Sequence, residues 1–363
     1  MRITALLTAF LLLVLFAASG VSAVSITDDL GVTVVIDKTP ERIVSLSPAN
    51  TEILFALGLD EKIVGVTEYC TYPDAALSKE KIGGFSTVNI EKVSVLNPDL
   101  IVAADGNSEE TVAHLRELGF TVITINADTI DTTLSDILLV GKATGTYTEA
   151  ENLVSSMRTE LAEIAEKTSA EEKPTILHCM WTDPLWVSGS GTFQDEMISA
   201  AGGLNAAANE EGWVALTMEK FLTINPDIIV VDSGDGMGVG TDDALKNFFL
   251  EDPRMQSLTA VENKQVYVVN ADIIDRGGPR IVDGVDALEG RMSYTMDDAA
   301  ALLTEKTAEV MALCTECAVE KVLAEANVYL RNHWEGLRGE KISSFAALEA
   351  LLQKEFSQGA MVC

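Results

Sequence analysis

An internal repeat constrains the fold of this chain more than any other feature. The stretch IEKVSVLNPDLIV, which begins at Ile90, returns as MEKFLTINPDIIV from Met218. Each copy predicts a short amphipathic helix, a turn at the residue before a proline, and a buried strand. Farther upstream, residues 43–59 parallel residues 186–204. The repeat therefore predicts a duplicated α/β lobe.

Strand and helix patterns alternate around both copies of the repeat. The expected strands are RIVSL, KIVGV, DLIVAA and TVITI in the first half, and TILHCMW, DIIVVD and QVYVVN in the second. Strands that alternate with helices indicate a parallel sheet covered on both faces. Residues 146–170 contain no Gly or Pro, and their apolar stripe is Val154, Met157, Leu161 and Ile164. This stretch predicts a long, rigid helix between the lobes.

These patterns divide the chain into five parts. The expected parts are a signal peptide (1–23), an N-terminal α/β lobe (24–145), a connecting helix (146–170), a C-terminal α/β lobe (171–292) and a helical tail (293–363). The tail lies outside the duplication, and its role is not legible from its pattern.

The first residues have the pattern of a secretory signal. Arg2 precedes an apolar run that ends in small residues, which predicts cleavage near Ala23. The alternative is an uncleaved membrane anchor, but the run is shorter than the roughly 18 residues that span a bilayer. No cysteine follows the run, so lipid attachment is not indicated there. We therefore expect an extracytoplasmic protein, either secreted, periplasmic or associated with the cell surface.

Charge and cysteine content exclude some classes of protein. The formal net charge is -31, from 56 acidic and 25 basic residues, whereas nucleic-acid binding requires clustered Lys and Arg. The five cysteines, an odd number, do not form a disulfide framework. They are Cys70, Cys179, Cys314, Cys317 and Cys363. The C-x-x-C pair in the tail could be redox-active or half of a metal site, but a helical pair without function is favoured.

Aromatic residues gather in loops that follow the expected strands. They make up 6% of the chain, so their concentration in these loops is informative. A large flat organic ligand requires aromatic faces and a few polar anchors. The candidates are Tyr69, Tyr72, Phe85, Trp186 and Trp213. Each of them alone could equally be a core or rim residue.

Three separated stretches resemble one known family. They are RIVSLSPANTEILFALGLDEKIVGVTEYCTYP, GGFSTVNIEKVSVLNPDLIVA and PLWVSGSGTFQDEMISAAGGLNAAA. They are similar to the substrate-binding proteins of ABC importers for cobalamin and ferric siderophores, and most closely to the cobalamin-binding branch. The match covers roughly residues 40–292. It implies an α/β fold of two Rossmann-like lobes with parallel sheets, joined by a long rigid helix, with ligand held in a cleft between the lobes.

The resemblance also implies roles for particular residues. It supports four of the aromatic candidates as ligand-facing, all except Tyr69, and it adds Arg276 as a ligand contact. Arg280 matches the same segment but could equally cap a helix or form an ion pair. Ala104 departs from the pattern, because the cobalamin proteins can carry an aromatic residue there. The exact ligand therefore stays open at this stage.

Two glutamates in the repeat match docking residues of that family. Glu91 and Glu219 occupy the positions at which each lobe contacts basic residues of one permease subunit. Equivalent carboxylates on pseudo-symmetric lobes suit a two-fold partner. The alternative is that each is only a favourable acid near a helix start. The expected partner is an ABC permease dimer with its cytoplasmic ATPase.

Enzymatic signatures fail on spacing. The stretch DSGDGMGVGTDD lacks the glycine spacing of a dinucleotide loop, and its aspartates would repel phosphates. His114, His178 and His333 show no metal-ligand spacing, and His178 is interpreted as a strand residue with a cleft-facing role left open. We therefore assign no catalytic residue, metal or cofactor.

The sequence thus predicts a monomeric, non-enzymatic receptor that captures a corrinoid and delivers it to an ABC permease. A ferric siderophore or haem receptor is the alternative within the same class. An exported redox or metal-handling enzyme that uses the C-x-x-C tail is the alternative from another class.

Overall fold

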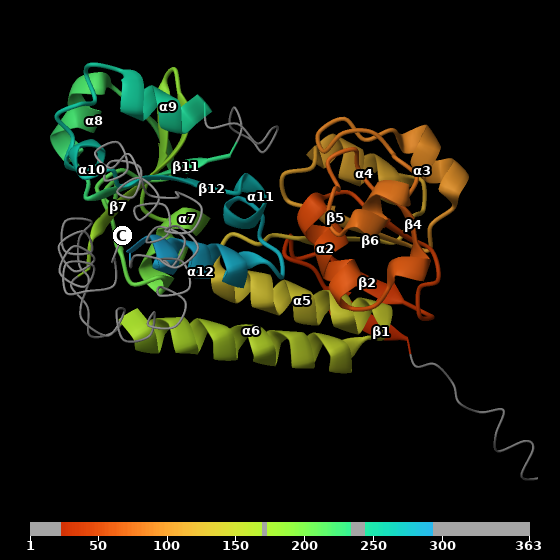
Figure 1. The fold of residues 1–363 in the computed structure, drawn as a ribbon. Coiled ribbons are helices and arrows are strands. Elements are labelled where there is room, and N and C mark those ends of the chain that lie inside the picture. Colours follow the sequence, from red (N-terminus) through yellow and green to blue (C-terminus); the bar gives the residue numbers. More distant parts are fainter. Residues whose placement is uncertain (1–22, 169–172, 234–243, 293–363) are drawn as a thin grey trace, which may run out of the picture. The chain divides into compact units, whose positions relative to one another are not determined.

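The computed structural model describes residues 23–168, 173–233 and 244–292. Within it the chain divides into two units. Unit 1 runs to Arg158 and includes Gly277–Pro279, whereas unit 2 comprises Thr159–Arg276 and the chain from Arg280 onward. The point at which the chain divides, after Arg158, lies within the long helix α6 (Tyr147–Thr168; Figure 1). It is the long helix expected over residues 146–170.

Both copies of the repeated motif fold as a helix, a turn and a strand. In the first copy, α3 (Ile90–Leu96) precedes β5 (Leu100–Ala104). In the second, α8 (Met218–Ile224) precedes β11 (Ile228–Asp232). The order of elements expected from the repeat is confirmed in both places.

An asparagine in the left-handed region ends the helix in each copy. Asn97 has φ 45° and ψ 60°, and Asn225 has φ 44° and ψ 67°. Asparagine tolerates this conformation better than most residues that carry a β-carbon, and the following proline cannot extend the helix. The identical turn explains why the sequence repeats Asn-Pro at both positions.

The aspartate that follows each proline holds the neighbouring strand. Asp99 accepts hydrogen bonds from the backbone N–H groups of Glu41 and Arg42, just before β3, at 2.9 Å each. Asp227 accepts from the backbone N–H and the hydroxyl of Thr175, the first residue of β7, at 2.8 and 2.6 Å. Each carboxylate thus anchors the parallel strand beside its own, which accounts for the repeated Asn-Pro-Asp.

The upstream parallel between residues 43–59 and 186–204 also has a structural basis. Helix α2 (Pro48–Ala56) and helix α7 (Phe193–Ala200) both end two residues before a glycine with positive φ, Gly58 at 73° and Gly202 at 90°. Such a glycine relieves the steric cost that a β-carbon meets in this conformation. The two lobes therefore end their first helices in the same way.

Unit 1 is built on a four-stranded parallel sheet with the order β4-β3-β5-β6. Its other strands are β3 (Ile43–Ser45), β4 (Ile63–Gly65) and β6 (Val122–Ile125). Its other helices are α4 (Glu109–Glu117), α5 (Ile130–Thr144) and the short 3-10 helices Asp60–Lys62 and Asp74–Ser78. An antiparallel pair, β1 (Val24–Thr27) and β2 (Thr33–Ile36), precedes the sheet. The parallel sheet expected here is confirmed.

Unit 2 has a mixed sheet with the order β10-β8-β7-β11-β12, and β9 also pairs with β7. Its other strands are β7 (Thr175–Thr182), β8 (Leu185–Ser188), β9 (Leu204–Asn205), β10 (Trp213–Leu216) and β12 (Val266–Val269). Its other helices are α9 (Ala244–Glu251), α10 (Thr259–Glu262), α11 (Ala271–Ile274) and α12 (Ile281–Met292). The expected parallel pairing holds for β7, β11 and β12. Strands β8 and β10 pair antiparallel and were not predicted.

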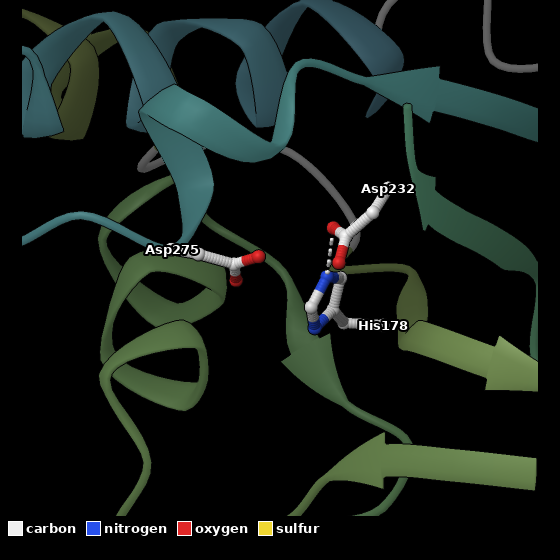
Figure 2. A group of neighbouring side chains, drawn as sticks. All are labelled: His178, Asp232 and Asp275. Atoms are coloured by element: carbon white, nitrogen blue, oxygen red, sulfur yellow. Dashed lines mark hydrogen bonds and ion pairs between the residues drawn. The ribbon is translucent and has the colours of Figure 1, made fainter. Parts of the chain in front are cut away.

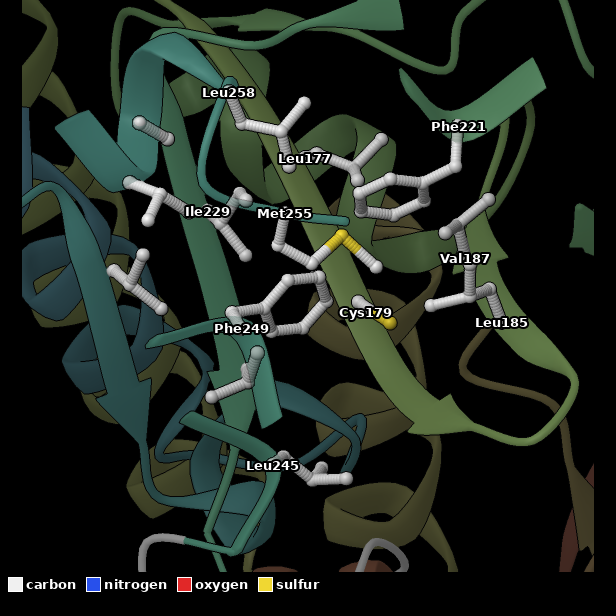
Figure 3. Packing of buried hydrophobic residues seen from close by; sticks show 14 of the residues in the cluster. Leu177, Cys179, Leu185, Val187, Phe221, Ile229, Leu245, Phe249, Met255 and Leu258 are labelled. Carbon is white, nitrogen blue, oxygen red and sulfur yellow. The ribbon is translucent and has the colours of Figure 1, made fainter. Parts of the chain in front are cut away.

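The core of unit 2 lies against one face of this sheet (Figure 3). Phe221 and Phe249 are fully buried, and their rings stack with centroids 5.5 Å apart. Leu177, Cys179 and Met255 belong to the same cluster. Burial of each large apolar side chain contributes about 1.5–3 kcal/mol to folding. This packing fixes the strands whose other face carries the candidate site.

The apolar stripe predicted for α6 is largely buried. Val154, Met157 and Ile164 are each less than 5% exposed, and Leu161 is partly buried. Within the described part of the chain, every helix is too short or too polar to cross a membrane.

Candidate functional site

Three tryptophans form an exposed surface on the antiparallel strands β7, β8 and β10 of unit 2. Trp181, Trp186 and Trp213, here called the tryptophan surface, are 41%, 37% and 40% exposed. In the β8–β10 register, Trp213 lies opposite Ser188 and Trp186 lies opposite Ala215. A bulge in β7 places Trp181 opposite Trp186. Opposed residues of antiparallel strands share a face, so the register brings the indoles to one side of the sheet.

The opposite face of these three strands packs into the core. Val187 of β8 lies opposite Val214 of β10 and opposite Cys179 of β7. Val187 and Cys179 are fully buried, and Val214 packs against their cluster. Because side chains alternate along a strand, burial of these residues presents the tryptophans away from the core.

A glycine loop fixes the position of Trp213. The N–H of Gly189 donates to the carbonyl of Gly212 at 2.9 Å, and the N–H of Gly212 donates to the carbonyl of Ser190 at 2.9 Å. A β-carbon on Gly189 would lie 2.3 Å from the Glu210 carbonyl oxygen, so only glycine fits. The SGSG stretch (residues 188–191) is therefore structural, because its backbone hydrogen bonds to Gly212 place Trp213 beside β8.

A buried polar cluster lies next to the tryptophan surface (Figure 2). His178 and Asp232 are 0% and 1% exposed, and Nε2 of His178 donates to Oδ1 of Asp232 at 2.9 Å. Nδ1 of His178 lies 3.2 Å from the Ser188 hydroxyl oxygen, and the imidazole meets the Trp213 ring edge-on with centroids 5.8 Å apart. Figure 2 shows the Asp275 carboxylate pointing toward the His178–Asp232 pair.

Asp232 raises the pKa values of its two ionisable neighbours, His178 and Asp275. Burial alone would lower the pKa of His178, but the carboxylates of Asp232 and Asp275 outweigh it and raise that pKa above its ordinary value. Desolvation by the surrounding protein and the charge of Asp232 raise the pKa of Asp275 to about 7. Asp275 nevertheless keeps access to solvent. Two carboxylates this close repel each other when both are charged, so a proton or a cation bound between them stabilises the pair.

The aromatic candidates of unit 1 lie at its surface. Tyr69 and Tyr72 are 54% and 45% exposed, and Phe85 is half-buried. The Phe85 ring lies so close to Gly106 that a β-carbon there would be 2.8 Å from it. Asn107 donates from its amide to the Phe85 carbonyl at 2.8 Å, which holds the loop in place. These contacts hold the Phe85 loop of unit 1 in place.

The remaining candidates have exposed or paired side chains. Arg276 follows α11 and forms an ion pair with Asp272 one turn earlier. Glu91 and Glu219 are both exposed in the first turn of their helices, two residues after the caps Asn89 and Thr217. The two glutamates therefore occupy equivalent positions in the two copies of the repeat.

The cysteines of the described chain are not reactive. Cys70 and Cys179 are buried and free, and burial raises the pKa of the Cys179 thiol to about 12. The predicted signal cleavage near Ala23 and the C-x-x-C pair at Cys314 and Cys317 fall at the edge of or outside the described residues. Those expectations stay predictions.

Sequence reasoning missed two parts of this site. Trp181 was not selected, although it belongs to the predicted strand TILHCMW and a third tryptophan near Trp186 was a visible signal. His178 was interpreted as a strand residue without metal-ligand spacing, and its partners Asp232 and Asp275 lie far away along the chain. Only the pairing of β7 with β11 brings His178 and Asp232 together.

Comparison with known proteins identifies the family. The model of the periplasmic binding protein family matches residues 43–273. An uncharacterized ABC transporter substrate-binding lipoprotein of Bacillus subtilis, YvrC, is 37% identical over 274 residues, 73% of this chain and 84% of that protein.

Solved structures agree with this match. The periplasmic vitamin B12-binding protein of Vibrio cholerae has a TM-score of 0.62 and 30% identity, over 69% of this chain and 96% of that one. The periplasmic heme-binding protein RhuT of Roseiflexus sp. RS-1, in apo form, has a TM-score of 0.61 and 29% identity, over 69% and 98% of the two chains. The chain therefore belongs to the periplasmic binding protein family, whose members serve ABC importers outside the cytoplasm as substrate-binding proteins and are not enzymes.

Proposed function

We propose that this protein captures a corrinoid and delivers it to the permease of an ABC importer. The tryptophan surface of unit 2 carries the proposal. It presents three indoles, each more than a third exposed, on one face of a sheet whose other face is packed. Exposed tryptophans held this firmly are uncommon away from binding surfaces.

The chemistry of a corrinoid suits these side chains. A corrin ring is large and mostly flat, so indole faces can cover much apolar area at a small cost in conformational entropy. Its peripheral amide groups require hydrogen-bond partners. The Arg276 guanidinium, oriented by Asp272, offers donors of the correct kind. Tyr69, Tyr72 and Phe85 of unit 1 are further candidates for contact with the ligand.

Similarity to a vitamin B12-binding protein supports a corrinoid in particular. Similarity to a heme-binding protein favours a second candidate, haem, which also has a flat macrocycle and would use the same indoles.

Glu91 and Glu219 are proposed as the residues that dock onto the permease. Both are exposed at the same place in a repeated structural unit. Two equivalent carboxylates match a permease dimer that offers the same basic site twice. Charge pairs of this type set orientation and association rate more than affinity.

The test is a panel of ligands titrated into the purified chain without its predicted signal peptide (residues 1–23). Cyanocobalamin, haemin and a ferric hydroxamate siderophore are titrated separately while tryptophan fluorescence is followed. We expect saturable one-to-one binding of cyanocobalamin that weakens in Trp186→Ala. The matched control is Tyr147→Ala, which removes an exposed aromatic side chain of α6 that is not part of the tryptophan surface. Binding of haemin or the siderophore alone would replace the corrinoid as ligand, and no binding of any of them would contradict the proposal.

A further inference from the structure

The polar cluster beside the tryptophan surface brings three metal-binding side chains together (Figure 2). One donor atom each from His178, Asp232 and Asp275 can be chosen so that all lie within 4.8 Å of one another. His178 lies in β7, Asp232 is the last residue of β11, and Asp275 directly follows α11. We propose that they bind one divalent transition-metal ion of the zinc class.

An unsatisfied buried oxygen marks where the ion would bind. Oδ1 of Asp232 accepts from His178, whereas Oδ2 is buried and has no hydrogen-bond partner in the part of the chain that the structure describes. A buried carboxylate oxygen without a partner is costly, because it has lost its hydration without compensation. A cation in front of it would supply that compensation.

The neighbours of the three ligands already have the arrangement that metal sites use. Binding of the ion to Nε2 of His178 would replace the present hydrogen bond from Nε2 to Asp232 and place the ring proton on Nδ1, from which it would be donated to the Ser188 hydroxyl oxygen 3.2 Å away. Gln194 donates to Oδ1 of Asp275 at 2.8 Å and to the Ile274 carbonyl at 3.1 Å. Hydrogen bonds of this kind fix the tautomer and orientation of ligating side chains. The Gln194 bond leaves Oδ2 of Asp275 available to the ion.

The donor set indicates the class of metal. One imidazole nitrogen and two carboxylates suit Zn²⁺ and related transition metals, whereas Mg²⁺ and Ca²⁺ are bound by oxygen ligands. Three protein ligands leave a fourth position for water or another small ligand. Asp275 is exposed, so solvent and ions can reach the cluster from its side.

Binding would join three segments of unit 2 and would be sensed by a neighbouring fluorophore. The ion would link β7 and β11 to the turn after α11, so it would stabilise the folded unit. The ring centroids of His178 and Trp213 are 5.8 Å apart. A paramagnetic ion on His178 would therefore quench the fluorescence of Trp213.

The test uses the purified full chain after chelator treatment, with Zn²⁺ in thermal unfolding and Co²⁺ in fluorescence quenching. We expect one equivalent of Zn²⁺ to bind. At a hundredfold excess over Kd it should raise the unfolding midpoint by about 5–10 °C. Asp275→Asn, at an exposed position, should weaken binding by at least about tenfold to a hundredfold. Trp213→Phe should remove the largest part of the Co²⁺ quench while leaving the Zn²⁺ stabilisation in place.

Asp286→Asn controls for general attraction of cations to a protein of net charge -31. Asp286 lines an acidic pocket of unit 2 with Glu160, Glu163 and Asp283, which contains no histidine. We expect this variant to bind Zn²⁺ as the unmodified protein does. A midpoint unmoved by Zn²⁺ would overturn the proposal. Equal binding by the unmodified protein and Asp275→Asn would also overturn it, because the ion would then be held elsewhere.

Discussion

Replacement of Trp213 by alanine tests how much of the binding energy the tryptophan surface supplies. Trp213 is 40% exposed. A tryptophan side chain presents up to about 250 Å², so about 100 Å² remains for a ligand to cover. At about 25 cal/mol per Å², full coverage contributes about 2.5 kcal/mol. Alanine retains some of this area, so we expect a loss of about 2 kcal/mol, or about 30-fold in Kd.

Calorimetric titration with cyanocobalamin measures this change directly. Trp213→Phe should lose less affinity than Trp213→Ala, because it keeps an aromatic face. Because Trp213 also packs against His178, the unfolding midpoint of each variant should be checked first. A folded Trp213→Ala protein that binds within twofold of the unmodified protein would refute the assignment of this surface to the ligand.

Three further predictions concern charge, docking and packing. Burial and a nearby carboxylate raise the pKa of Asp136 to about 9; the folded state therefore holds a proton that the unfolded chain loses near pH 4, and stability falls as pH rises toward 9. Between pH 6 and 8 the unfolding free energy should fall by up to about 1.4 kcal/mol per pH unit, and Asp136→Asn should remove this fall. Chemical denaturation at several pH values measures it, and an equally steep fall in Asp136→Asn would count against the prediction. Glu91→Ala with Glu219→Ala should abolish ligand uptake by cells but leave binding in solution unchanged, and normal uptake would exclude docking through these residues. Phe249→Ala should cost about 3–5 kcal/mol of unfolding free energy, whereas Leu250→Ala, at a position 38% exposed, should cost much less; equal losses in chemical denaturation would contradict the described core.

The repeat predicted the local structure well because its information is local. Amphipathic spacing, a turn before proline and a following apolar run together specify a helix, a turn and a strand. The left-handed Asn97 and Asn225 follow from the same residues. The hydrogen bonds that Asp99 and Asp227 accept could not be predicted in this way, because each joins segments more than fifty residues apart in the chain.

The candidate site was only partly visible in the sequence. Trp186 and Trp213 were selected as residues of loops that follow strands, which was wrong because they lie within β8 and β10. Their shared face depends on the unpredicted pairing of these two strands. Trp181 joins them through a bulge, which no periodic pattern indicates.

The polar cluster lay beyond sequence reasoning for a related physical reason. A histidine in an apolar strand is usually a core residue, and its spacing to other ligands gives no signal when the partners come from separate strands and turns. The sheet order places Asp232 beside His178, and α11 brings Asp275 to them.

A crystal structure of the protein with cyanocobalamin tests the central claim most directly. The account predicts a corrin ring in contact with the indoles of Trp186 and Trp213. A corrinoid bound elsewhere, with both indoles left in solvent, would contradict it.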